Sequence, residues 1–99
     1  MNKFFVMGRL TKDPETRYKG EMAISKFSIA VNRKFKEDAT DYFNCISFGK
    51  QAEFIQKYIT KGTKVVVTGR VENESYEKDG QKKTFTQIVV EEIEFAESK

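Results

Sequence analysis

The chain has 99 residues, of which 38% are hydrophobic and 33% charged, with a formal net charge of +3. This length predicts a single small domain over residues 1–99, and the apolar share is too large for a disordered chain. No apolar run approaches the roughly 18 residues that a membrane helix requires, so we expect no contact with a membrane. The single cysteine, Cys45, cannot form an internal disulfide, which favours the reducing cytoplasm.

Histidine is absent from the sequence, which removes the commonest general base and the commonest metal ligand. One cysteine cannot supply a structural zinc site. The acidic residues gather towards the C-terminal end rather than on an apolar background that would shift a pKa. We therefore expect a protein that is not an enzyme and that needs no cofactor, metal ion or small-molecule substrate.

The charges are distributed unevenly along the chain. Residues 1–70 carry a net charge of +7, whereas residues 71–99 carry −4. A basic body of this kind favours a polyanionic partner, although a merely solvated surface produces the same counts about as often.

The first half of the chain predicts three strands. Residues 2–10 are rich in β-forming side chains and are followed by the turn signal Asp13-Pro14. Apolar and polar residues alternate over residues 23–35, which predicts a second strand. After a polar stretch, aromatic and β-branched residues predict a third strand over residues 41–48.

In the second half of the chain the spacing of the apolar residues changes. Between Gly49 and Gly62 the apolar residues recur at helical spacing, and Gly62 lies where the glycine that ends a helix is expected. Alternation returns in two further strands, about 63–76 and 82–95. Asp79-Gly80 between them is the strongest hairpin signal in the chain.

The resulting order has five strands with one short helix between the third and the fourth. This order predicts an all-β protein with the five-stranded Greek-key barrel of the oligonucleotide/oligosaccharide-binding (OB) fold. Gly8 and Gly69 lie inside predicted strands, where they fit the sharp coiling of a small closed sheet or mark bulges.

Nine phenylalanines and four tyrosines are more aromatic residues than a core of this size requires. Phe4, Phe27, Phe54 and Phe95 fall on apolar stripes, and we interpret them as core residues. Cys45 lies within a strand, where a small buried residue is a better interpretation than a reactive thiol.

Two other rings lack apolar neighbours. Phe35 lies within Arg33-Lys34-Phe35-Lys36, at the end of a strand where a long hairpin is expected, and Tyr76 lies near the tip of the last hairpin. An exposed ring between cations is suited to single-stranded nucleic acid, because each base has a face whose stacking contributes roughly 1–3 kcal/mol.

Two further rings leave more than one interpretation open. Tyr42 alternates with Phe43, so one ring faces the barrel and the other faces outward, while Phe48 ends the same strand before Lys50. Tyr42 could bind a base or only cover the barrel, and Phe48 could bind a base or plug its end. Lys61-Gly62-Thr63-Lys64 lacks the upstream glycine of a phosphate-binding loop, so we interpret it as the end of a helix.

Taken in order and spacing, several short segments give the chain a resemblance to the bacterial single-stranded DNA-binding protein family over nearly all of residues 2–96. The resemblance implies an OB fold, usually a homotetramer and less often a dimer, that coats single-stranded DNA during replication, recombination and repair. The segments are Asn2-Lys3, Met7-Gly8-Arg9-Leu10, Asp13-Pro14-Glu15, Arg17-Tyr18, Phe27-Ser28-Ile29-Ala30-Val31, Phe48-Gly49-Lys50-Gln51-Ala52-Glu53, Tyr58, Lys61-Gly62, Asp79-Gly80-Gln81 and Ile88-Val89-Val90.

The resemblance also implies which residues contact DNA. The base-stacking rings of the family carry over onto Phe35, Tyr42, Phe48 and Tyr76. Its backbone-binding bases carry over onto Lys3, Lys50 and Lys61. From their charge and position we add Arg9, Arg33 and Lys34 as further phosphate-binding residues.

The chain departs from the family pattern in three ways. Family members often carry Trp at three of the stacking positions, whereas this sequence has none, which predicts weaker stacking per base. Glu72, Glu74 and Glu77 surround Tyr76 and are expected to repel phosphate. The chain stops at residues 96–99, where typical members continue into a flexible linker and an acidic peptide that recruits enzymes, so we expect no recruitment through such a tail.

Two alternatives to a coat for single-stranded DNA remain. One is an OB-fold adaptor resembling the primosomal replication proteins, dimeric and acting mainly through protein contacts. The other is RNA binding, because base stacking does not distinguish the sugar.

Overall fold

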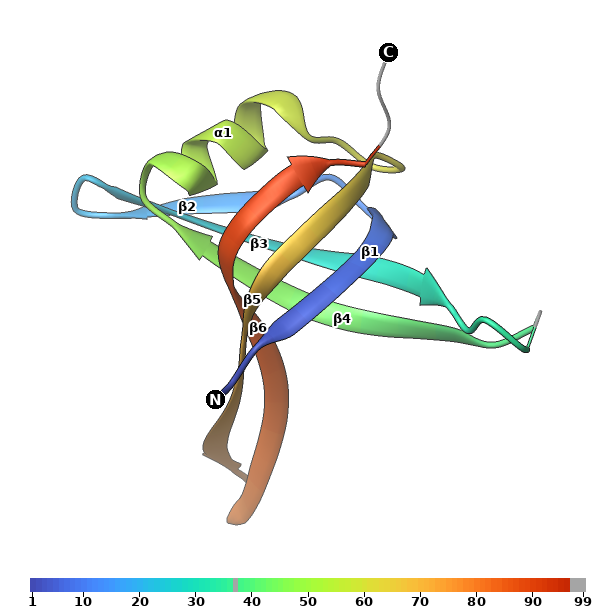
Figure 1. Ribbon diagram of the computed structural model, residues 1–99. Helices are drawn as coiled ribbons and strands as arrows, with labels where there is room; N and C mark the ends of the chain where they lie inside the picture. The colour runs from blue at the N-terminus through green and yellow to red at the C-terminus, as the bar shows by residue number, and fades with distance from the viewer. Residues whose placement is uncertain (37, 97–99) are drawn as a thin grey trace.

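The computed structural model describes residues 1–36 and 38–96. Glu37 and residues 97–99, where the departure at the chain end was noted, lie outside the described part. The described residues form six strands and one helix (Figure 1). In chain order these are β1 (Phe4–Leu10), β2 (Glu15–Lys19), β3 (Met22–Asn32), β4 (Thr40–Phe48), α1 (Lys50–Tyr58), β5 (Lys64–Lys78) and β6 (Gln81–Phe95).

The strands form one sheet in the order β1-β5-β6-β4-β3-β2. A further pairing of Arg9 and Leu10 with Ala30 and Ile29 joins β1 to β3, so the sheet closes on itself. The closure is ring-like rather than a continuous barrel, because β4 and β6 are joined through two parallel residue pairs, Cys45 with Ile88 and Ile46 with Val89. This arrangement, with one helix between the third and fourth of the five long strands, confirms the predicted all-β OB architecture.

The short strand β2 was not predicted from the sequence. It pairs antiparallel with β3, from Glu15 opposite Lys26 to Lys19 opposite Met22. Four of its five residues are exposed, so it lacks the apolar alternation that predicts a strand. Its conformation is stabilised by hydrogen bonds to β3 and not by a buried face of its own.

Several element ends also differ from their predicted positions. Strand β3 ends at Asn32, and the chain then turns, with the Arg33 N–H donating to the Ala39 carbonyl oxygen at 3.0 Å. Phe35 therefore lies in the turn and not on the strand. Helix α1 ends at Tyr58, and Gly62 follows in the next turn with φ +86°. The hairpin prediction is confirmed, because Asp79 and Gly80 have φ values of 54° and 75°, as a tight two-residue turn requires.

The core lies between the curved sheet and helix α1, which covers one end of the ring in Figure 1. The helix contributes Ala52 and Ile55, both fully buried. Burial of a large aliphatic side chain such as that of Ile55 contributes about 1.5–3 kcal/mol to stability. The largest fully buried side chains among the described residues are Ile29, Ile55, Ile59, Ile88, Val65, Val67, Ser25 and Ser47.

Gly8 and Gly69 lie where two strands approach closely. A Cβ atom at Gly69 would lie 2.2 Å from the Val89 carbonyl oxygen, and one at Gly8 would lie 2.6 Å from the Ala30 carbonyl oxygen. The register of β5 and β6 also shifts between Thr68 and Gly69. Gly69 therefore marks a bulge at which the sheet bends.

The four phenylalanines interpreted as core do not share one environment. Phe27 is buried, and Phe4 packs against the core with its ring 5.0 Å from that of Phe43. Phe54 and Phe95 were wrongly assigned to the core, since they are 37% and 48% exposed. They contact each other on the outside of the fold, with ring centroids 6.0 Å apart, because their apolar stripes have no neighbouring element to cover them.

The interpretation of Cys45 as a buried residue is confirmed. Its side chain is 2% exposed. Burial raises the pKa of the thiol to about 12, because a thiolate loses its hydration in the core. The neutral thiol is the form present at physiological pH, and it is a poor nucleophile.

Candidate nucleic-acid interface

The outer face of strands β3 and β4 carries two of the predicted rings. The register places Tyr42 opposite Ala30 and Phe48 opposite Ile24. Tyr42 is 66% exposed and Phe48 is 44% exposed, whereas the alternate residue Cys45 is buried. The period of a strand therefore directs Tyr42 and Phe48 to the same face, with the core on the other.

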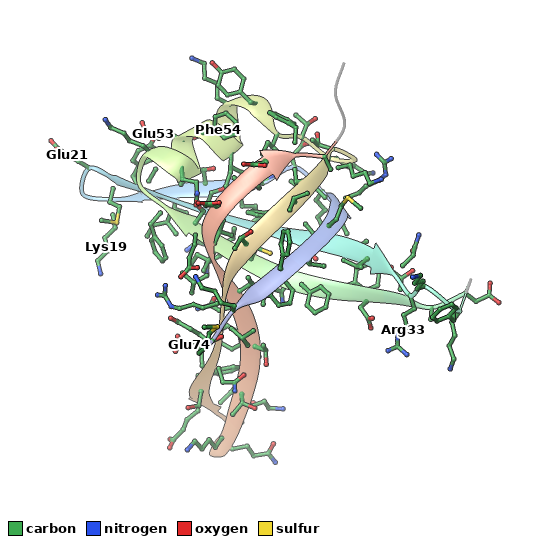
Figure 2. All side chains as sticks on the ribbon, viewed as in Figure 1. Lys19, Glu21, Arg33, Glu53, Phe54 and Glu74 are labelled. Atoms are coloured by element: carbon green, nitrogen blue, oxygen red, sulfur yellow. The ribbon has the colours of Figure 1, made fainter. Side chains whose placement is uncertain are left out.

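Phe35 lies in the turn between β3 and β4 and is 90% exposed. The Lys34 ammonium lies 5.6 Å from the centre of its ring, so a cation and a stacking face are side by side. Figure 2 shows the neighbouring Arg33 where this hairpin projects from the body of the protein.

Arg33 forms an ion pair with Asp41. Its guanidinium donates hydrogen bonds to both oxygens of Asp41, at 3.0 Å from Nη2 and 3.1 Å from Nε. The hydrogen bonds hold the pKa of Asp41 below its usual value and raise the pKa of Arg33. Because its charge is balanced, Arg33 is better placed to hold the base of the hairpin together than to attract phosphate over a distance.

Tyr76 lies on the long hairpin of β5 and β6, which extends away from the ring in Figure 1. Its ring centroid lies 6.0 Å from that of Phe85 on the facing strand. Lys83 lies opposite Tyr76, and Lys82 lies opposite Glu77. Lys82 thus offsets the charge of Glu77, and the expected repulsion of phosphate near Tyr76 is smaller than the sequence of β5 alone indicates.

The predicted phosphate-binding residues differ in whether their side chains already form an ion pair or a hydrogen bond within the protein. Lys3 forms an ion pair with Glu91, with 2.9 Å between Nζ and Oε1, and this hydrogen bond lowers the pKa of Glu91. Arg9 donates a hydrogen bond to the Gly62 carbonyl oxygen at 3.0 Å. The side chains of Lys50 and Lys61 are exposed and form no ion pair with any other described residue.

The candidate residues occupy three places in the fold. Tyr42 and Phe48 share the sheet face, Phe35 lies in the β3–β4 turn, and Tyr76 lies on the β5–β6 hairpin. In Figure 2 the labelled Arg33 and Glu74 mark the two separate hairpins. The arrangement offers an extended track rather than a single cavity, which suits a flexible chain of bases.

A further exposed ring on the β5–β6 hairpin was not predicted from the sequence. Phe85 is 43% exposed and lies in the otherwise polar run from Gln81 to Gln87. An isolated ring among polar residues is the signal that identified Phe35, so the same reasoning could have found it.

Comparison with known proteins decides the family. The model of the family described as Single-strand binding protein family matches residues 1–96. The chain belongs to this family.

Similar proteins include three bacterial relatives, each named single-stranded DNA-binding protein. The Clostridium perfringens protein is 46% identical over 99% of this chain and 67% of its own length. The Fusobacterium nucleatum protein is 41% identical over 100% of this chain and 69% of its own length. The Staphylococcus epidermidis protein is 40% identical over 100% of this chain and 79% of its own length.

These names do not favour the alternative of an adaptor that acts mainly through protein contacts. Within residues 1–36 and 38–96, no helix is long and apolar enough to cross a membrane.

Proposed function

We propose that this protein binds single-stranded DNA with little dependence on base sequence and without catalysing a reaction. Bases stack on the exposed rings while lysine and arginine side chains neutralise phosphates. The observation that carries the proposal is the pair of exposed rings, Tyr42 and Phe48, on the outer face of β4. The family membership supports the same function.

We further propose that the protein protects single strands exposed during replication, recombination and repair in the cytoplasm. The rings of Phe35 and Tyr76 extend the binding track beyond the sheet. Lys3, Arg9, Lys34, Lys50 and Lys61 contact the sugar-phosphate backbone, whereas Arg33 stays paired with Asp41 and holds the base of the hairpin. The buried, protonated thiol of Cys45 is unreactive in a reducing or an oxidising compartment, so it is compatible with the cytoplasm.

The test is an anisotropy titration of a labelled oligothymidylate against a duplex of the same length, at low and at moderate salt. We expect tight binding to the single strand, because the bases of a duplex have no free faces for stacking. The logarithm of the affinity is expected to fall with the logarithm of the salt concentration with a slope of about −0.7 per neutralised phosphate. Equal affinity for both forms, or an affinity independent of salt, would contradict the mechanism.

Substitution of Phe35 by Ala is expected to weaken binding to single-stranded DNA by about 1 kcal/mol, or roughly fivefold. The effect lies at the lower end of the range for stacking because Phe35 is in a turn, where ordering the loop offsets part of the gain. The side chain is 90% exposed, so the melting temperature is expected to stay unchanged. An unaltered affinity in the same titration would show that Phe35 is an ordinary surface ring.

We also propose that the protein is a homo-oligomer, with a tetramer favoured over a dimer. Residues Phe4–Gly8 of β1 pair with β5 on one side, and among the described residues no strand pairs with their other edge. Phe5 and Met7 on this strand are 76% and 50% exposed. An open edge with apolar side chains is stabilised when it pairs with a second copy across a two-fold axis.

Light scattering tests the oligomeric state directly. A tetramer has a mass of about 46 kDa, four times the 11.5 kDa of the chain. A mass that stays at the monomer value over the concentration range of the DNA titration would contradict this proposal and leave the DNA-binding proposal intact.

A further inference from the structure

Two basic and two acidic side chains meet at the base of the β5–β6 hairpin. The carboxylate of Glu91 lies 2.9 Å from Lys3 Nζ and 3.7 Å from Arg70 Nη1. The Nε of Arg70 also donates a hydrogen bond to Glu72 Oε2 at 2.9 Å. Two cations are thus balanced by two carboxylates, and Arg70 has no part in the predicted site.

The strand register places Arg70 on the face that carries two of the predicted rings. Along β4, Ile46 is separated by an even number of residues from Tyr42 and Phe48, so its side chain leaves the same face. Ile46 pairs with Val89 of β6, and Val89 pairs with Arg70 of β5. Because residues directly opposite each other share a face of the sheet, Arg70 lies on the outer face with the rings of β4.

The same face continues along the hairpin to Tyr76. Arg70, Glu72 and Tyr76 are separated by even numbers of residues in β5, so their side chains leave the same side of the strand. Figure 2 shows Glu74, the next residue of this series, on the hairpin beyond the ring. A DNA strand that passes from the sheet face to the ring of Tyr76 therefore meets Arg70 on the way.

The N-terminal segment fixes Lys3 close to Arg70. The side-chain amide of Asn2 donates to the Val71 carbonyl oxygen at 2.7 Å and accepts from the Val71 N–H at 2.9 Å. These two hydrogen bonds hold the residues before β1 against β5. The side chains of Lys3 and Arg70 are 59% and 44% exposed, so a ligand from solvent has access to both.

Arg70 uses fewer of its donors than Arg33 does. The guanidinium of Arg33 donates to both oxygens of Asp41. Arg70 donates to Glu72 through Nε, and the 3.7 Å between its Nη1 and Glu91 exceeds hydrogen-bond distance. Its terminal N–H groups therefore keep donors that suit a phosphate. Exposed ion pairs stabilise a fold only weakly, so a phosphate can take the place of a carboxylate.

We propose that Arg70 is a further phosphate-binding residue of the track, and that Glu72 and Glu91 compete with the DNA for it and so limit the affinity of the protein for single strands. The inference rests on the proposed binding of single-stranded DNA. A phosphate that reaches Arg70 displaces a carboxylate and leaves it without its cation. The contact therefore adds less to the affinity and to its salt dependence than an unpaired arginine would add.

The test repeats the anisotropy titration of labelled oligothymidylate with variants that remove one carboxylate. Glu72→Gln is expected to bind about threefold more tightly than the wild type, as loss of one exposed ion pair predicts. The salt dependence is expected to become steeper by about 0.7, the value for one more neutralised phosphate. Glu91→Gln is expected to act in the same direction, because it releases Lys3 as well as Arg70. Adding Arg70→Gln to Glu72→Gln is expected to remove the gain.

Glu53→Gln is the matched control, because it makes the same change of charge on α1. Glu53 is exposed and forms no ion pair with any other described residue, and Figure 2 shows it on the helix and away from the hairpin. Salt of about 0.15 M screens exposed charges beyond about 8 Å, so its affinity at moderate salt is expected to equal that of the wild type.

Three results overturn the proposal while tight binding by the wild type still supports the proposed function. They are no gain of affinity in Glu72→Gln, an equal gain in Glu53→Gln, and a gain that persists when Arg70→Gln is added. Failure of the wild type to bind oligothymidylate at low salt overturns both. The melting temperature of each variant shows that the comparison is made between folded proteins.

Discussion

Tyr42→Ala is expected to weaken binding to single-stranded DNA by about 2–3 kcal/mol, or roughly 30- to 150-fold. The ring lies on the β3–β4 face, on the third residue of β4, where backbone pairing with β3 holds it before the DNA arrives. Such a preordered ring loses little conformational freedom on binding, so most of the stacking energy is retained. At 66% exposure the ring has a small part in folding, and the melting temperature is expected to stay within about 2 °C of the wild type.

Tyr18→Ala is the control for this substitution. Tyr18 is 57% exposed but lies opposite the buried Ala23, on the other face of the sheet from Tyr42. Its loss is expected to change the affinity by less than a factor of about two, as for a residue outside the binding track. If the two variants lose the same affinity in the anisotropy titration, the β3–β4 face is not the stacking platform.

Gly69→Ala is expected to destabilise the protein by about 3 kcal/mol, which lowers the melting temperature of a domain of this size by roughly 12–24 °C. The new Cβ would lie 2.2 Å from the Val89 carbonyl oxygen and 3.0 Å from its carbonyl carbon. Both are backbone atoms, so relief requires β5 and β6 to move apart at the bulge. Thermal unfolding at a fixed protein concentration measures the effect.

Gly20→Ala is the control, because it tests the cost of a backbone conformation that favours glycine at a position where a Cβ has space. Gly20 has φ +63°, but a Cβ there would meet nothing within 4 Å. Its substitution is expected to cost about 1 kcal/mol, the strain of an L-residue in the left-handed region. A Gly69→Ala variant no less stable than Gly20→Ala would show that the close approach of β5 and β6 is not a constraint on the fold.

Local patterns were sufficient to predict most of the architecture. Alternation over residues 23–35 predicted the strand β3, and Asp79-Gly80 located the final turn, because both signals depend on neighbouring residues alone. Strand β2 was not predicted, because hydrogen bonds to β3 stabilise it and it has no buried face that would produce an alternating pattern. Phe54 and Phe95 were misassigned because an apolar stripe indicates which side is apolar, not whether a neighbouring element covers it.

The candidate site was predictable to the extent that it rests on single exposed rings. Phe35 and Tyr76 were identified by their polar neighbours, and the resemblance to a family added Tyr42 and Phe48. The ion pair of Arg33 with Asp41 and that of Lys3 with Glu91 were not predictable, because pairing across strands depends on the three-dimensional register.

The measurement that tests the account most directly is photocross-linking of an oligonucleotide carrying 5-iodouracil, with the linked residues identified by mass spectrometry. Cross-links are expected at Tyr42 and Phe48 on the sheet face and at Tyr76 or Phe85 on the β5–β6 hairpin. The equally accessible Tyr18 and Tyr58, exposed at 57% and 55%, serve as internal controls. Cross-links concentrated at Tyr18 and Tyr58, with none on the β3–β4 face, would contradict the proposed path of the DNA.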